Sequence, residues 1–277
     1  MVHMKSTIAV LVFATLASTM ARAKTPVKAP AQAGATVEKV LDFYHTEDFL
    51  DDCLKHVEDA LERRKKELAV DDAAAKRLKD VAARIYVKRN LYDVFKVAYA
   101  KQTTLENMTA LWEWMNSPIG LLLRKAYSDH YKTPYKSWKA YYDKESTNVL
   151  KPNRKNALNT LLVSSGQNEL AITKILGADF AVWWALNAIQ PQPETLRYIR
   201  SKITPRRTRY IEPARAYYEI FDAALLRDLK NEQIDELTRF STSVIGQGAD
   251  KAYRAALEMT LDSAAKTLGS QLAKGTK

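Results

Sequence analysis

One stretch of the chain occurs twice, and this internal repeat limits the fold more than any other feature. Residues 89–127 align without a gap on residues 215–253, and 12 of the 39 positions are identical. Unrelated segments of this length would share about two or three residues, so we interpret the pair as a tandem repeat. The shared positions describe a scaffold and carry no obvious chemistry. They include Arg89/Arg215, Tyr92/Tyr218, Phe95/Phe221, Leu111/Leu237, Ser117/Ser243, Ile119/Ile245, Gly120/Gly246 and Tyr127/Tyr253.

The repeated stretch has the periodicity of helices. Its apolar residues recur at steps of three and four, which indicates a stripe facing a core. A gap near 102–104 separates two helices, and a third begins at Ser117-Pro118, because Ser can cap a free N–H and Pro suits the first helical position. Sustained alternation and Asn-Gly turns are missing from the sequence, so strands are not expected. We therefore predict an all-α fold of two tandem helical-bundle repeats joined by a basic, aromatic-rich connector.

The boundaries of these parts follow from composition. We expect a signal peptide over 1–23, a flexible lead-in rich in Pro and Ala over 24–35, helical repeat 1 over 36–130, the connector over 131–156 and helical repeat 2 over 157–277. The helices are expected near 36–44, 46–69, 72–86, 89–101, 104–116, 118–131, 135–146, 154–165, 167–189, 193–203, 212–229, 231–243 and 247–272.

Part of the repeat resembles a known family. Glu113-Trp114-Met115-Asn116-Ser117-Pro118-Ile119-Gly120 is similar to the Phe-Tyr-x-Ser-Pro-x-Gly run of a family of secreted bacterial helical domains, domain of unknown function 2059. The second copy, 240–246, has lost the Pro and the second aromatic residue, and 161–166 resembles the opening Leu-Leu-x-x-x-Gly of that family. The resemblance implies a secreted all-α module in two divergent copies, and it implies no activity.

The N-terminus indicates export. Lys5 precedes an apolar run over 8–17, and Ala21-Arg22-Ala23 is a small-x-small cleavage site, the pattern of a secretory signal peptide. No later run of 18 or more apolar residues appears, so we expect a water-soluble, periplasmic protein. Removal of 1–23 lowers the formal net charge from +11 to +9. The single Cys53 allows no internal disulfide; we expect it to be buried, with a surface thiol linking a homodimer as the alternative.

Catalytic and metal-binding motifs are weak. His45, Asp48, Asp52 and His56 fall on one face of an expected helix, but a straight helix cannot wrap four ligands round one ion, so we expect a solvated acidic stripe and no metal or cofactor. A Gly-x-Ser-x-Gly elbow and a Gly-rich phosphate loop are both missing from the sequence. We therefore expect no enzyme.

Two basic segments are the candidate binding residues. The connector carries seven Lys or Arg against two acidic residues, interleaved with aromatic residues, and a second cluster follows the Thr204-Pro205 break. Their candidate partner-binding residues are Tyr131, Lys132, Tyr135, Lys136, Trp138, Lys139, Arg206, Arg207 and Arg209.

Several occupants fit a basic and aromatic surface. Tyr, Trp and Arg are common anchors for an acidic protein partner. The same residues can hold anionic lipid headgroups or a cell-wall polymer, or they can be a solvated turn and a helix packed between the repeats. Export argues against nucleic acid. The leading hypothesis is a non-catalytic periplasmic protein-binding module, most concretely an immunity-type inhibitor of a toxic secreted effector; the alternative is an envelope-associated factor that binds lipid headgroups or peptidoglycan.

Overall fold

The described part of the computed structural model is built from helices. The structure describes residues 34–65, 67, 70–148, 152–190 and 193–274, and it contains no strand among them. The all-α prediction is therefore confirmed. The expected signal peptide over 1–23 and most of the expected lead-in lie outside the described residues.

The helices follow the order of the sequence prediction closely. The first half holds α1 (Val37–Phe43), α2 (Thr46–Leu50), α3 (Cys53–Lys65), α4 (Asp72–Ile85), α5 (Lys88–Gln102), α6 (Leu105–Met115) and α7 (Pro118–Tyr131). The connector forms α8 (Tyr135–Asn148) and the start of α9 (Pro152–Ser164). The second half holds α10 (Gln167–Asn187), α11 (Leu196–Ile203), the 3-10 helix η1 (Thr204–Arg207), α12 (Thr208–Leu225), α13 (Asn231–Thr242) and α14 (Val244–Lys274).

Short polar side chains fix several helix starts, because the first N–H groups of a helix have no partner inside it. Thr36 accepts from Lys39 N at 3.3 Å, and Asp71 accepts from Ala74 N at 2.7 Å. Thr195 does the same for Tyr198 N at 3.2 Å. These caps are local, which explains why sequence alone placed most boundaries within a few residues.

The expected single helix over 46–69 is wrong. The chain breaks at Asp51-Asp52 into α2 and α3, and α3 ends at Lys65. The cause lies far away in sequence: Lys174 of α10 donates from Nζ to the carbonyl oxygen of Phe49 (2.6 Å) and pairs with the carboxylate of Asp52. A continuous helix would need the Phe49 carbonyl for its own ladder.

The two copies of the repeated stretch make the same turn between consecutive helices, at 116–120 and at 242–246. We call each of these turns a corner. Ser117 Oγ accepts from Gly120 N at 3.2 Å, and Ser243 Oγ accepts from Gly246 N at 3.1 Å. The second copy has Val244 in place of Pro118, and a helix was expected only from 247; α14 nevertheless begins at Val244, as α7 begins at Pro118. Both glycines are needed because a Cβ at either position would overlap carbonyl oxygen at the end of the preceding helix, that of Trp114 or of Phe240.

Equivalent residues of the two copies also meet. The rings of Trp114 and Phe240, related by the shift of 126 residues, stack with centroids 3.5 Å apart and planes 8° apart. Equivalent helices differ in length, since α14 continues 17 residues beyond the place that matches the end of α7. The tandem duplication and the boundaries of its two repeats remain a prediction that these shared features support.

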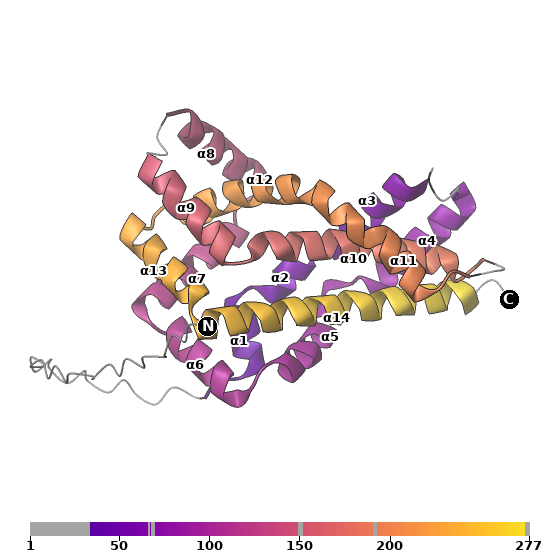
Figure 1. Ribbon diagram of the computed structural model, residues 1–277, viewed down its shortest axis with the longest axis horizontal. Helices are drawn as coiled ribbons and strands as arrows, with labels where there is room; N and C mark the ends of the chain where they lie inside the picture. Colours follow the sequence, from indigo (N-terminus) through magenta and orange to yellow (C-terminus); the bar gives the residue numbers. More distant parts are fainter. Residues whose placement is uncertain (1–33, 66, 68–69, 149–151, 191–192, 275–277) are drawn as a thin grey trace, which may run out of the picture. The chain divides into compact units, whose positions relative to one another are not determined.

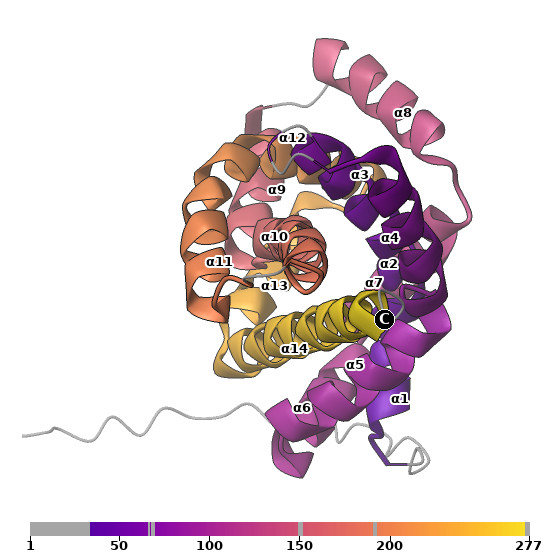
Figure 2. The same ribbon diagram turned by 90° about the vertical axis from the view of Figure 1, so that its right-hand side faces the viewer.

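The two longest helices, α10 and α14, lie side by side and carry neighbours from both halves (Figure 1). α14 packs on α4, α5 and α6, and α10 packs on α3, α11 and α12; Figure 2 looks along this arrangement. Buried side chains of both halves join one hydrophobic core. None of the described helices is long and apolar enough to cross a membrane.

We predict that Gly120→Ala and Gly246→Ala each lower the free energy of unfolding by about 1–3 kcal/mol, because the added Cβ forces the corner apart. Gly248→Ala is the matched control: a Cβ at Gly248 meets nothing within 4 Å in helix α14. Alanine there is a better helix former than glycine, so this variant should be neutral or more stable by about 0.5–1 kcal/mol. Urea unfolding of the three variants measures both effects, and equal losses at all three sites would contradict the corner argument.

Candidate functional site

The connector places its aromatic residues against the core and its lysines outward. Trp138 of α8 stacks on the imidazole of His130 at 3.6 Å between ring centroids and meets Phe221 edge-on at 5.8 Å. Lys132 and Lys139 are exposed, and Lys139 pairs with Asp143 at 2.6 Å. Of Tyr135 and Lys136 the structure gives only the backbone, at the start of α8. The expected aromatic stripe of α8 is thus mainly a packing face.

Tyr131 closes the end of α7. Its ring stacks on His45 with centroids 5.1 Å apart and lies 6.4 Å from Tyr127. Burial raises the pKa of the Tyr131 hydroxyl well above its ordinary value. This candidate anchor is therefore largely occupied within the protein.

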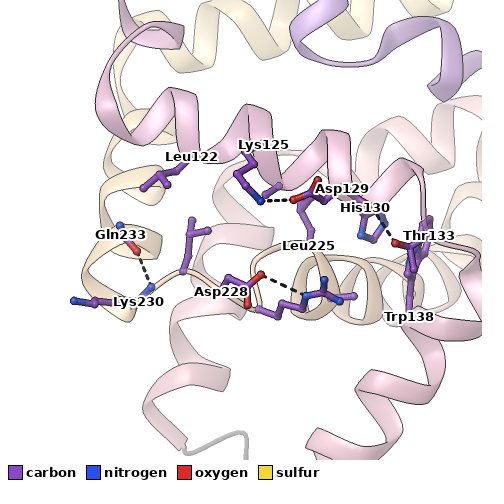
Figure 3. A pocket seen from close by; sticks show the side chains of 14 residues that line it. Leu122, Lys125, Asp129, His130, Thr133, Trp138, Leu225, Asp228, Lys230 and Gln233 are labelled. Atoms are coloured by element: carbon purple, nitrogen blue, oxygen red, sulfur yellow. Dashed lines mark hydrogen bonds and ion pairs between the residues drawn. The ribbon is translucent and has the colours of Figure 1, made fainter.

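A cavity of about 240 Å³ opens beside Trp138, between α7 and the turn from α12 to α13 (Figure 3). We call it the connector cavity. Its apolar wall includes Leu122, Leu225 and Leu229, and its polar wall is contributed by Lys125, Asp129, His130, Thr133, Arg227, Asp228, Lys230 and Gln233. The sequence prediction named Trp138 from this set and missed the others.

Charges of both signs surround the connector cavity. Lys125 Nζ lies 2.5 Å from Asp129 Oδ2, and Arg227 Nε lies 3.5 Å from Asp228 Oδ2. His130 is only 5 % exposed, and burial together with the positive charge of Arg227 lowers its pKa to about 4. The imidazole is therefore neutral at pH 7, and it adds no charge to a wall that carries three cations and two carboxylates.

Arg154 positions the lower rim of the connector cavity. Its guanidinium donates from Nη1 to Leu229 O at 2.5 Å and from Nη2 to Leu226 O at 2.6 Å. These carbonyls belong to the turn that carries Arg227 and Lys230, so the connector holds the rim in place. Nothing near Arg154 in the sequence marks these distant acceptors, so the sequence predicts no role for it beyond its charge.

The basic turn lies elsewhere. The basic turn, 204–207, precedes α12. Trp138 of α8 contacts Phe221 near the other end of α12, and a helix of 18 residues extends about 27 Å. Figure 1 shows α8 and α11 at opposite ends of α12. The structure therefore does not join the nine predicted residues into one site.

Two of the three turn arginines are used inside the protein. Arg206 pairs through its guanidinium with Glu67 and lies over the ring of Trp183, 5.2 Å from the centroid. Arg207 pairs with Glu169 of α10. Among the described residues Arg209 has no ion-pair or hydrogen-bond partner, and it is exposed. The arginines of the basic turn therefore mainly form ion pairs that hold neighbouring elements of the fold together.

A buried cluster of charged side chains around Asp179 also connects distant parts of the chain. Asp179 of α10 is fully buried, 2.6 Å from Arg64 Nη2 and 3.1 Å from Arg63 Nη2, and it accepts a hydrogen bond from the Tyr210 hydroxyl at 3.2 Å. A buried carboxylate of this kind is tolerated because it is paired on several sides. Its sequence signal was a single acidic residue inside the apolar run 176–182.

Asp222 is the opposite case. It is 1 % exposed, and neither carboxylate oxygen has a hydrogen-bond partner within the described part of the chain. Burial raises its pKa to about 8. A small cavity of about 20 Å³ separates it from Tyr142 of α8. At pH 7 this carboxyl is therefore mostly protonated.

The four residues of the expected acidic stripe form two separate pairs. His45 Nδ1 lies 3.3 Å from Asp48 Oδ2, and His56 Nε2 lies 3.3 Å from Asp52 Oδ2. Burial acts to raise the pKa of Asp52, but His56 and Lys174 outweigh it and lower that pKa to about 2. The described residues contain no group of three or more His, Cys, Asp or Glu side chains placed to hold a metal ion.

Cys53 is buried, as expected, and burial raises the pKa of its thiol to about 12. A thiol of this kind is neither a ready nucleophile nor a surface link between two copies.

No protein-family model matches this chain, and no curated protein and no solved structure matches it. The resemblance to domain of unknown function 2059 remains a prediction based on the short motif at 113–120.

We predict that Asp222→Asn changes the pH dependence of stability. The folded pKa of about 8 exceeds the unfolded value, so the free energy of unfolding of the wild type falls as pH rises from about 4 and levels off above about 8. The variant lacks this loss. Its advantage should grow across that range by about 1.4 kcal/mol per unit of pKa difference.

Chemical denaturation between pH 4 and pH 9 measures the effect, with Asp228→Asn as the control because the Asp228 side chain is 86 % exposed. Parallel curves for wild type and Asp222→Asn would contradict the burial argument.

We also predict that Arg206→Glu lowers the free energy of unfolding by about 1–3 kcal/mol, because it sets a second carboxylate against Glu67. Arg209→Glu, on the exposed side of the same segment, should change it by less than about 0.5 kcal/mol. Thermal unfolding of the two variants measures this difference. If the basic turn were a free surface patch, both substitutions would change the free energy of unfolding equally.

Proposed function

We propose that this chain is a non-catalytic protein-binding module of the periplasm, and that it acts as an immunity-type inhibitor that masks a toxic secreted protein. The observation that carries this proposal is the connector cavity. Its volume of about 240 Å³ is below the roughly 300–1,000 Å³ of pockets that enclose a drug-sized ligand. It suits the tip of one protruding side chain, which is how an anchor residue of a protein partner is held.

The surroundings of the cavity support the same proposal. Lys132 and Lys139, next in sequence to the lining residues Thr133 and Trp138, are exposed. Asp228 and Arg227 are exposed on the rim of the cavity. A recess with a mixed, solvent-accessible charged rim resembles the layout of protein interfaces, in which polar residues surround a central pocket. The signal-peptide pattern over 1–23 supports a periplasmic partner.

The alternative, an envelope factor that binds lipid headgroups or peptidoglycan, depended largely on the basic turn. Arg206 and Arg207 already pair with Glu67 and Glu169. To bind an external anion, these arginines would have to leave their carboxylates. The free energy lost with the internal ion pairs would offset the free energy gained from the new contact. This internal pairing favours a protein partner at the connector.

Site-specific photocrosslinking tests the proposal in cells that export the full chain. A benzophenone amino acid replaces Leu122 or Asp228 at the rim, both of which line the cavity and are exposed, or Lys76 as the control. Lys76 is exposed on α4 and pairs only with its neighbour Asp80 in the described structure. We expect one protein adduct from the rim positions and none from position 76, since only the rim meets the partner.

The adduct partner is then produced in the periplasm without this chain, and growth is measured. Growth should fall, recover with the wild-type chain, and not recover with a folded Arg227→Glu/Lys230→Glu variant. Adducts with lipid or glycan, adducts between two copies of this chain, or equal adducts from position 76 would each overturn the proposal.

A further inference from the structure

The N-terminus of α13 lacks the side-chain cap that its counterpart has. Thr104 caps α6 by accepting from Asn107 N at 3.2 Å. The position 126 residues later is Lys230, whose side chain gives α13 no cap hydrogen bond. The Gln233 side chain accepts only from Lys230 N, at 2.8 Å, which lies before the first turn of the helix. A lysine side chain cannot accept a hydrogen bond, and the first N–H groups of a helix carry a partial positive charge. This helix end therefore favours an external acceptor, and Lys230 and Gln233 of its first turn line the connector cavity.

The side chains at this place add positive charge. Lys125 is neutralised by Asp129 at 2.5 Å, whereas Arg227 meets the exposed carboxylate of Asp228 only through Nε at 3.5 Å. Within the described part of the chain, Lys230 has no ion pair. Three cations against two carboxylates leave an excess of one positive charge on the wall of the cavity.

One residue that lines the connector cavity has a buried polar atom without a hydrogen-bond partner. His130 lines it and is 5 % exposed, yet its Nε2 has no hydrogen-bond partner within the described residues. The stacked ring of Trp138 and the edge of Phe221, whose centroid lies 4.4 Å away, hold the imidazole in place. A buried ring nitrogen without a partner costs free energy unless a ligand or water satisfies it. This observation is independent of the charges and points to a guest with a hydrogen-bonding group.

We propose that the connector cavity binds a carboxylate group, held by Arg227, Lys230 and the N-terminus of α13 at its mouth and by the imidazole of His130 within it. A single carboxylate matches the single excess positive charge, and a guanidinium pairs well with its planar pair of oxygens. A phosphate dianion would leave one charge uncompensated in a partly apolar recess. The inference rests on the proposed function in taking the carboxylate to come from a protein partner, as an acidic side chain or a free C-terminus.

The inference is tested with small probes on the purified, exported protein, so that it does not depend on knowing the partner. Sodium acetate is titrated at pH 7 against sodium chloride of equal ionic strength. Nitrogen NMR follows the His130 ring and the Arg227 Nε. We expect saturable shifts at both residues, and in acetate we expect the apparent pKa of His130 to rise from about 4, because a bound anion offsets the charge of Arg227.

Short peptides distinguish the two sources of the carboxylate. Acetyl-Ala-Glu-Ala-amide presents only a side-chain carboxylate, and acetyl-Ala-Ala-Ala with a free end presents only a terminal one. Acetyl-Ala-Gln-Ala-amide is the neutral control and should not bind. Whichever acidic peptide binds more tightly identifies the group that the partner supplies.

Matched variants assign the binding to this cavity. Arg227→Gln or Lys230→Gln should weaken binding by about tenfold or more, Arg227→Lys should retain part of it, and Lys76→Gln should leave it unchanged. Overlaid melting curves confirm that each variant is folded.

Shifts that never saturate, or equal binding by Arg227→Gln and wild type, would overturn the carboxylate site even if photocrosslinking finds a protein partner. Conversely, carboxylate binding without any protein adduct would keep the site and remove the proposed function.

Discussion

The close packing of α10 on α14 is the contact on which the rest of the structure depends. Gly177 leaves room for Leu261, and Gly269 leaves room for Trp184, so the two longest helices approach along small residues. Each then offers its remaining faces to other elements: α14 to α4, α5 and α6, and α10 to α3, α11 and α12. Because the helix of one predicted half packs on three helices of the other, the core is shared, and neither half would bury its apolar face alone.

Ion pairs between buried charged residues also connect the two halves. These pairs show that much of the positive charge in the sequence is used inside the protein. Asp179 of α10 holds Arg63 and Arg64 of α3, while Lys174 of α10 holds Asp52. Further out, Glu67 and Glu169 take Arg206 and Arg207. Counting charges along the sequence suggested a free basic turn, but most of that charge is compensated by residues that lie more than thirty positions away. An excess of positive charge therefore gives a poor measure of binding surface in a helical protein with many cross-chain ion pairs.

The connector both joins the two halves and builds the strongest candidate site. Trp138 and Tyr142 face the core, where they adjoin two ionisable groups held neutral by burial, His130 and Asp222. Arg154 fixes the rim that carries Arg227 and Lys230. The same segment thus supplies packing, alignment of the rim and the mouth of the cavity. Thr104 caps α6, and the equivalent position before α13 is Lys230. Under this proposal, the difference between the two copies at this position serves ligand binding.

The sequence by itself determined the helices and most of their boundaries, because these depend on residues a few positions apart. Apolar spacing predicted the helices, and capping residues such as Asp71 and Ser117 predicted where they begin, because a cap and its N–H lie three residues apart. The break between α2 and α3, the fate of Arg206 and the connector cavity followed from no such pattern. Each depends on a partner over 70 residues away: Lys174 for Phe49, Glu67 for Arg206, and Arg154 for the turn after α12. Only the packed structure decides which of many charged side chains meet, because pairing depends on distance in space and not on order along the chain.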